Sequence, residues 1–115
     1  AGASEVLVAS AKRWALMHEH RDAAEAEPRL DALLPRLGEA DLVLVEGFKH
    51  EGHDKIEVCR EGTRRAPLYP GGRSVVAVAS DQALPDAGRP VLDLDDTQAI
   101  ADFICRHCGL AERTA

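Results

Sequence analysis

Apolar and polar residues alternate along this chain in blocks that predict strands and helices. Apolar runs predict strands over residues 5–10 (EVLVAS), 41–47 (DLVLVEG), 55–60 (KIEVCR) and 75–80 (VVAVAS), and a short strand in PVLDL. The unbroken runs in DLVLVEG and VVAVAS are typical of strands that are buried on both faces of a sheet. KIEVCR alternates and predicts a strand with one face exposed to water. RWALMHEH, residues 13–20, is an ordered stretch whose type the pattern leaves open.

One amphipathic helix is predicted after Pro28. Four leucines there share one helical face at i, i+3, i+4 and i+7: Leu30, Leu33, Leu34 and Leu37. Gly38 is expected to cap the helix at its carboxyl end. Pro35 removes a helical hydrogen bond, so the helix is expected to kink or end there.

A second helix is predicted near the carboxyl end of the chain. Asp95 and Gln98 have the spacing of a capping box. The apolar stripe of this helix consists of Ile100, Phe103, Ile104 and Cys108. Gly109 is expected to end it.

These elements together predict an α/β fold, with a mostly parallel sheet and flanking helices. Fully apolar strands that alternate with helices imply a parallel sheet covered on both faces. Such sheets bind ligands at the carboxyl ends of their strands. Glu46 and Asp81 each follow one of the most apolar runs, so we expect both carboxylates at this edge.

Glu46 and Asp81 are therefore the candidate functional carboxylates. An apolar strand that ends in an acid has the general form of a Walker B segment, whose carboxylate helps to hold Mg²⁺. Asp81 is a candidate reader of guanine, because one carboxylate can accept both donors on the edge of that base. The alternatives are structural: Glu46 caps a helix or pairs with Lys49, and Asp81 caps a helix or a turn. The pattern alone favours these alternatives.

Metal and phosphate motifs are weak or absent in the sequence. Several histidines and a glutamate have no recognised ligand spacing: His18, Glu19, His20, His50 and His53. Cys105 and Cys108 form one C-R-H-C pair, whereas zinc sites usually need two such pairs. None of the nine glycines lies in a G-x-x-x-x-G-K-[ST] phosphate loop.

Composition narrows the class of protein. The chain has 115 residues, which favours one domain, and a formal net charge of -6, which argues against a general nucleic-acid surface. No apolar run is long enough to cross a bilayer, and no signal peptide opens the chain, so no membrane partner is expected. The odd count of three cysteines suggests reduced thiols in a cytoplasm.

Several of these segments resemble, in order, the MobB family of adaptor proteins in molybdopterin-guanine dinucleotide biosynthesis. The resemblance rests on AGASEVLVAS, RWALMHE, DLVLVEGFKHE, KIEV, VVAVASD, VLDLDD and AIADFI, which together cover most of the chain. VEGFKHE and RWAL are its most specific parts. The family opens with a strand, a P-loop and a helix before the AGA stretch. Residues 1–115 are therefore expected to form part of a single P-loop GTPase-like domain that lacks these elements.

The resemblance implies a cytoplasmic GTP-binding protein, dimeric and a weak GTPase at most. It would assist molybdenum cofactor guanylyltransferase, which attaches GMP to molybdopterin. Glu46 matches the Walker B-like acid and would help to hold Mg²⁺. Gly47, Lys49 and Asp81 would contribute to the binding of GTP. Two alternatives stay open: a protein-interaction module without nucleotide, and a metal-dependent hydrolase built on Glu46, His50 and His53.

Overall fold

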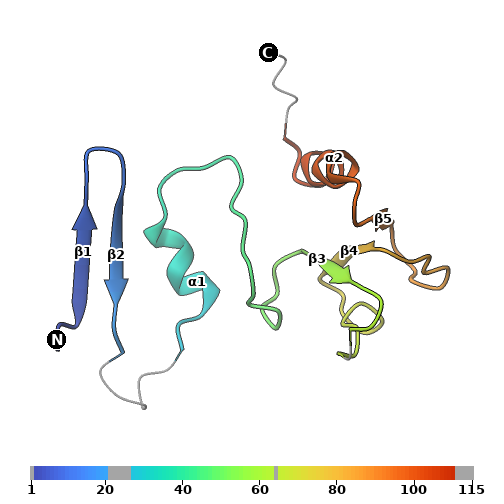
Figure 1. Cartoon of the computed structure of the whole chain (residues 1–115), viewed down its shortest axis with the longest axis horizontal. Helices are drawn as coiled ribbons and strands as arrows, with labels where there is room; N and C mark the ends of the chain where they lie inside the picture. Colours follow the sequence, from blue (N-terminus) through green and yellow to red (C-terminus); the bar gives the residue numbers. More distant parts are fainter. Residues whose placement is uncertain (1, 21–26, 64, 111–115) are drawn as a thin grey trace. The chain divides into compact units, whose positions relative to one another are not determined.

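The structure is a computed structural model that describes residues 2–20, 27–63 and 65–110. Its contacts divide the chain into two compact units, Ala1–Leu37 and Gly38–Ala115. Figure 1 shows the first unit in blue to cyan and the second in green to red.

The first unit begins with an antiparallel hairpin of β1 (Glu5–Ala9) and β2 (Trp14–His18). β1 confirms the strand predicted in EVLVAS, and β2 shows that the RWAL stretch is also a strand. Ser10 closes the connection, because its N–H donates to the Arg13 carbonyl at 2.8 Å while its hydroxyl accepts from the Arg13 N–H at 3.3 Å. This pair is antiparallel, so the sheet content of the chain is not uniformly parallel.

Both faces of the hairpin carry apolar side chains. Leu7 lies opposite Leu16 on one face, and Val6 lies opposite Met17 on the other. Leu7 is 64% exposed and Trp14 is 70% exposed. An isolated two-stranded hairpin is marginally stable in water, because the hairpin alone leaves these apolar side chains exposed.

The predicted leucine helix forms, and it ends early. α1 (Leu30–Leu33) is followed directly by the 3₁₀ helix η1 (Leu34–Arg36), which has Pro35 in its first turn. Pro35 therefore ends the α-helix, as its missing N–H predicts. The expected cap at Gly38 is wrong, since Leu37 already leaves the helix with extended dihedrals (φ -82, ψ 147) and Gly38 has no positive φ.

The second unit contains the predicted parallel sheet. Its order is β3 (Lys55–Cys59), β4 (Val75–Ser80) and β5 (Val91–Asp93), with both pairings parallel. β4 is the central strand and the most buried one, as its unbroken apolar run predicts, and Val78 is fully buried. The carboxyl ends of all three strands point the same way, so the loops that follow them share one edge of the sheet.

β5 leads into α2 (Thr97–His107), the clearest predicted helix. The cap is Asp96 rather than Asp95: the Asp96 carboxylate accepts from the Ala99 N–H at 2.9 Å, and the Asp95 N–H donates to the Asp93 carboxylate. The predicted capping box is therefore wrong: Asp96 caps the helix alone, because Ala99 has no polar side chain to bond back, and the Gln98 amide donates to the Asp102 carboxylate at 2.9 Å. Gly109 ends the helix with a left-handed φ of 65, as expected.

The strand predicted over residues 41–47 is wrong. The segment is irregular and pairs with no strand among the described residues. Leu44 is 77% exposed. A strand buried on both faces needs neighbours, and the described sheet holds only β3, β4 and β5. The apolar run lies along a cavity beside β3 instead.

Within the described residues, we find no helix with both the length and the apolar character that a membrane span requires.

A network around Gly72 connects the loop that precedes β4 to the rest of the unit. The Arg89 guanidinium donates to the carbonyls of Gly72 and Val75 at 2.9 and 2.7 Å. A Cβ atom on Gly72 would lie 2.8 Å from the Leu68 carbonyl oxygen, whereas a Cβ on Gly71 would meet nothing within 4 Å. Gly72 is thus required by close packing against the backbone.

We expect Gly72→Ala to lower the free energy of unfolding by about 1–3 kcal/mol, because the added methyl group must displace backbone. Gly71→Ala is the matched control and should change the stability by less than about 0.5 kcal/mol. Urea unfolding of both variants measures the difference. Equal stability of the two variants would contradict the tight contact at Gly72.

Candidate functional site

Three hollows in the second unit hold the candidate residues. An apolar cavity of about 500 Å³ lies along β3 and α2. A cationic pocket of about 760 Å³ lies beside the loop that follows β3. A strand-end pocket of about 290 Å³ lies at the carboxyl ends of β4 and β5.

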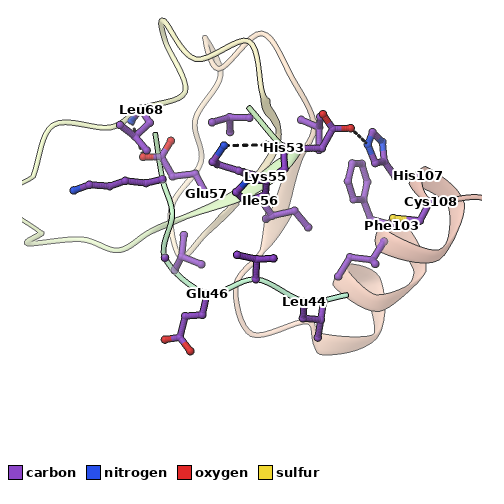
Figure 2. A pocket seen from close by; sticks show the side chains of 18 of the residues that line it. Leu44, Glu46, His53, Lys55, Ile56, Glu57, Leu68, Phe103, His107 and Cys108 are labelled. Carbon is purple, nitrogen blue, oxygen red and sulfur yellow. Dashed lines mark hydrogen bonds and ion pairs between the residues drawn. The ribbon is translucent and has the colours of Figure 1, made fainter. Parts of the chain in front are cut away.

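The apolar cavity is built by residues 42–47, β3 and the second half of α2 (Figure 2). Its apolar lining includes Leu42, Leu44, Val45, Ile56, Phe103 and Ile104. The α2 stripe predicted from the sequence therefore forms one wall of this cavity. Cys108, the last member of the predicted stripe, also lines the cavity although it is exposed.

Lys55 anchors one end of this cavity. Its ammonium donates to the His53 carbonyl at 2.9 Å and to the Ser74 hydroxyl at 3.3 Å, and also to the Glu51 carbonyl. These acceptors compensate a part-buried charge and fix the turn before β3. In the described structure, the His53 Nδ1 atom is buried without a hydrogen-bond partner. A lysine at the start of a strand was the one sign of this anchor that could be seen in the sequence.

Asp54 connects the entry of β3 to the end of α2. Its carboxylate lies 2.7 Å from His107 Nε2, and the His107 ring stacks on Phe103 with centroids 5.7 Å apart. Asp54 and His107 both line the apolar cavity, and Figure 2 shows the His107 ring on α2 beside Phe103. The contact joins two residues that are 53 positions apart in the sequence.

Glu57 holds the loop that follows β3. Its two carboxylate oxygens accept from the backbone N–H groups of Leu68 and Tyr69, each at 2.7 Å. The alternation in KIEVCR predicts a strand with one face exposed to water. In the structure, β3 is half-buried at every position except Val58, which is 60% exposed, and the Glu57 carboxylate is directed to the loop backbone.

Glu46, Gly47 and Lys49 lie together, as neighbours in sequence must, and all three line the apolar cavity. Gly47 has a φ of 84, a left-handed conformation that glycine adopts without a steric penalty, and Phe48 follows with a φ of 50. Figure 2 shows the Glu46 carboxylate pointing away from Lys55 and Glu57. No ion pair joins Glu46 to Lys49 in the described part of the chain.

Asp81 follows β4 directly, as predicted, and lines the strand-end pocket. Its carboxylate accepts from the Glu61 N–H at 3.0 and 3.3 Å. The expectation that Asp81 and Glu46 would meet at one edge of the sheet is wrong, because Glu46 is not at the end of a strand and lines a different hollow.

Cys59 ends β3 and lines the cationic pocket. Burial raises the pKa of its thiol, and the negative charges of Glu57 and Asp81 raise the pKa further. The thiol therefore stays protonated near neutral pH. Thiolate nucleophiles and ligands have lowered pKa values, so Cys59 has the opposite character.

The described structure contains no group of side chains that supports either of the metal sites considered from the sequence. Over residues 2–20, 27–63 and 65–110, no group of three or more His, Cys, Asp or Glu side chains is arranged to hold a metal ion. This covers Glu46 with His50 and His53, and the C-R-H-C segment at the end of α2. The rings of His18 and His20 lie edge to face, 5.8 Å apart.

We expect Glu57→Gln to lower the free energy of unfolding by about 1–3 kcal/mol, since an amide offers one acceptor where the loop needs two. Glu61→Gln is the control, because Glu61 is exposed and only its backbone N–H is engaged. Urea unfolding gives the stabilities. If both variants were as stable as the parent, the two hydrogen bonds from the Leu68 and Tyr69 N–H groups to Glu57 would not stabilise the loop.

Comparison of the sequence with known proteins identifies its family. The family model "MobB: Molybdopterin guanine dinucleotide synthesis protein B" matches residues 1–81. The chain is similar to the "Molybdopterin-guanine dinucleotide biosynthesis adapter protein" of Escherichia coli (strain K12), with 42% identity over 105 residues, 90% of this chain and 59% of the relative. The protein of the same description from Haemophilus influenzae is 39% identical over 106 residues, 90% of this chain and 56% of the relative.

The chain thus spans less than two thirds of the length of these relatives. The family match includes Glu46, Gly47, Lys49 and Asp81, and it extends from β1 to the end of β4. Since that match covers more than half of its 115 residues, the chain belongs to the MobB family.

Proposed function

We propose that this chain is part of an adapter protein of molybdopterin guanine dinucleotide biosynthesis. In this function it assists molybdenum cofactor guanylyltransferase, which joins GMP to molybdopterin. The single observation that carries the proposal is the family match over residues 1–81. The described role of the Escherichia coli relative as a biosynthesis adapter protein supports it.

The proposal includes GTP and Mg²⁺ as cofactors. Glu46 would help to hold Mg²⁺, Lys49 would approach phosphate, and Gly47 would turn the chain between them. The support is geometric: Glu46 and Lys49 line the same cavity, are both exposed, and are not paired with each other in the described structure. Carboxylates are ligands that Mg²⁺ prefers.

Asp81 would read the guanine base. Its carboxylate already accepts from the Glu61 N–H, and each carboxylate oxygen has a further lone pair for an incoming donor. Asp81 is exposed at the carboxyl end of a parallel strand, where α/β sheets bind ligands. Its separation from Glu46 requires that a bound nucleotide extend between two hollows, or that residues 41–47 move.

We also propose that the fold is P-loop GTPase-like and that its phosphate loop lies in the part of the relatives that this chain does not span. The parallel β3, β4 and β5 support this assignment, as does the coverage of only 59% of the Escherichia coli protein. Such a protein would act in the cytoplasm, together with the guanylyltransferase that it assists.

A homodimer is the proposed assembly. The hairpin of β1 and β2 exposes apolar side chains on both faces, including Leu16 at 53% and Met17 at 50%. Exposed apolar surface of this kind is typical of a protein interface. A second copy of the hairpin would bury it.

The test measures the formation of molybdopterin guanine dinucleotide by purified guanylyltransferase with and without the complete protein. We expect the protein to raise the rate. Glu46→Gln should cost about tenfold of this stimulation at limiting Mg²⁺, a typical loss for a weakened metal site. Glu39→Gln, also an exposed acid of the second unit, should cost nothing.

Absence of any stimulation by the parent protein would overturn the adapter proposal. Stimulation that is equal in the Glu46→Gln variant and independent of Mg²⁺ would instead favour an interaction module without nucleotide chemistry.

A further inference from the structure

The cationic pocket is a second hollow beside β3, and it adjoins the apolar cavity, with which it shares Lys49, Glu57, Val58 and Leu68. Its volume is about 760 Å³, within the usual range for small-molecule sites. Its lining includes Lys49, Arg60, Thr63, Arg65, Leu68 and Tyr69. The turn that follows β3 places Arg60 and Thr63 together, since the Thr63 N–H donates to the Arg60 carbonyl at 3.2 Å.

The charges in this pocket are unbalanced. Lys49, Arg60 and Arg65 are exposed, and within the described residues none of them forms an ion pair. The acid in the lining is Glu57, and both of its oxygens are already engaged by backbone N–H groups at 2.7 Å. Three cations therefore face the hollow of a protein whose formal net charge is -6.

Negative groups near the pocket offset only part of this charge, since Glu57 is the single acid in the lining against three cations. Asp81 is close enough to Cys59 to raise its pKa, but Asp81 lines the strand-end pocket and accepts from the Glu61 N–H. The Glu61 side chain is exposed and does not line the cationic pocket. The local field is thus suited to an anion, and arginine forks bind phosphate with two parallel hydrogen bonds.

One wall of the pocket is apolar. It includes Pro67, Leu68 and Leu84, with the Tyr69 ring beside them. The Arg89 guanidinium lies 5.9 Å from the centroid of that ring, and its hydrogen bonds to backbone carbonyls hold it in place. A cationic rim and an apolar wall together suit a ligand that has a flat ring and a charged group.

We propose that the cationic pocket binds a phosphate-bearing heterocyclic small molecule. Arg60, Arg65 and Lys49 hold the phosphate, and the wall at Leu68 and Tyr69 contacts the ring. The choice of ligand rests on the proposed function, in which GMP and molybdopterin both carry a phosphate group on a ring system. The acidic character of the whole chain opposes a polynucleotide at this site.

Cys59 provides a residue-level reporter, because its thiol lines the same pocket. In the complete protein, Cys59 is alkylated with N-ethylmaleimide at pH 8.5, and the extent is measured by peptide mass spectrometry. Cys108 is the internal control, since it is exposed and does not line this pocket. The probes are GMP, molybdopterin and guanosine.

We expect GMP or molybdopterin to slow alkylation of Cys59 several-fold and to leave Cys108 unchanged. Guanosine lacks the phosphate and should not protect. Arg60→Gln and Arg65→Gln should each raise the half-protecting concentration about tenfold, the usual effect of losing a charge-assisted hydrogen bond. Arg73→Gln, an exposed arginine of the same unit outside the pocket, should leave it unchanged.

Protection by GMP alone would identify the nucleotide as the ligand, and protection by molybdopterin alone would identify the pterin. Either result supports the site. The proposal is overturned if neither compound protects Cys59, or if Arg60→Gln and Arg65→Gln are protected at the same concentrations as the parent. That failure is separate from the adapter proposal, which depends on stimulation of the guanylyltransferase by the parent protein.

Discussion

The pairing of β4 with a parallel strand on each side is the constraint on which the second unit depends. β4 is buried along almost its whole length, so its backbone N–H and C=O groups must be satisfied by β3 and β5. Parallel pairing directs the three carboxyl ends to one edge, and the chain must return across the unit between strands. The loops after β3 and β4, which carry Arg60 and Asp81, are positioned by this requirement.

Charged side chains then hold these loops by binding backbone groups. Glu57 accepts from two N–H groups of one loop, Lys55 donates to carbonyls of the turn before β3, and Arg89 donates to carbonyls at the start of β4 and just before it. Each charge is satisfied by the backbone rather than by an opposite charge. Among the described residues, Lys49, Arg60 and Arg65 of the cationic pocket form no ion pair, and they outnumber Glu57, the one acid of its lining.

The sequence predicted the parts of the fold that local pattern determines. The strands at β1, β3, β4 and β5 and the helix α2 follow from apolar periodicity, and the early end of α1 follows from Pro35. The segment at 42–45 has the pattern of a strand, but no strand lies beside it among the residues that the structure describes, and a local pattern does not depend on whether a neighbouring strand exists. The role of the Glu57 carboxylate could not be predicted from local pattern either, because it accepts from N–H groups eleven and twelve residues further along the chain. For the candidate site, sequence proximity was enough to bring Glu46 to Lys49, whereas the separation of Asp81 from Glu46 depends on tertiary structure.

The two apolar faces of the β1–β2 hairpin have a consequence for strand register. In most hairpins a slip of one residue moves apolar side chains into water, and that cost fixes the alignment. Here a slip exchanges one apolar face for another, so burial hardly discriminates between alignments. The alignment rests instead on the Ser10 turn and on the contact between Glu5 and His18, 3.3 Å apart at the open end of the hairpin. Two small polar contacts, rather than the large apolar surface, thus decide which side chains each face presents to a neighbouring molecule.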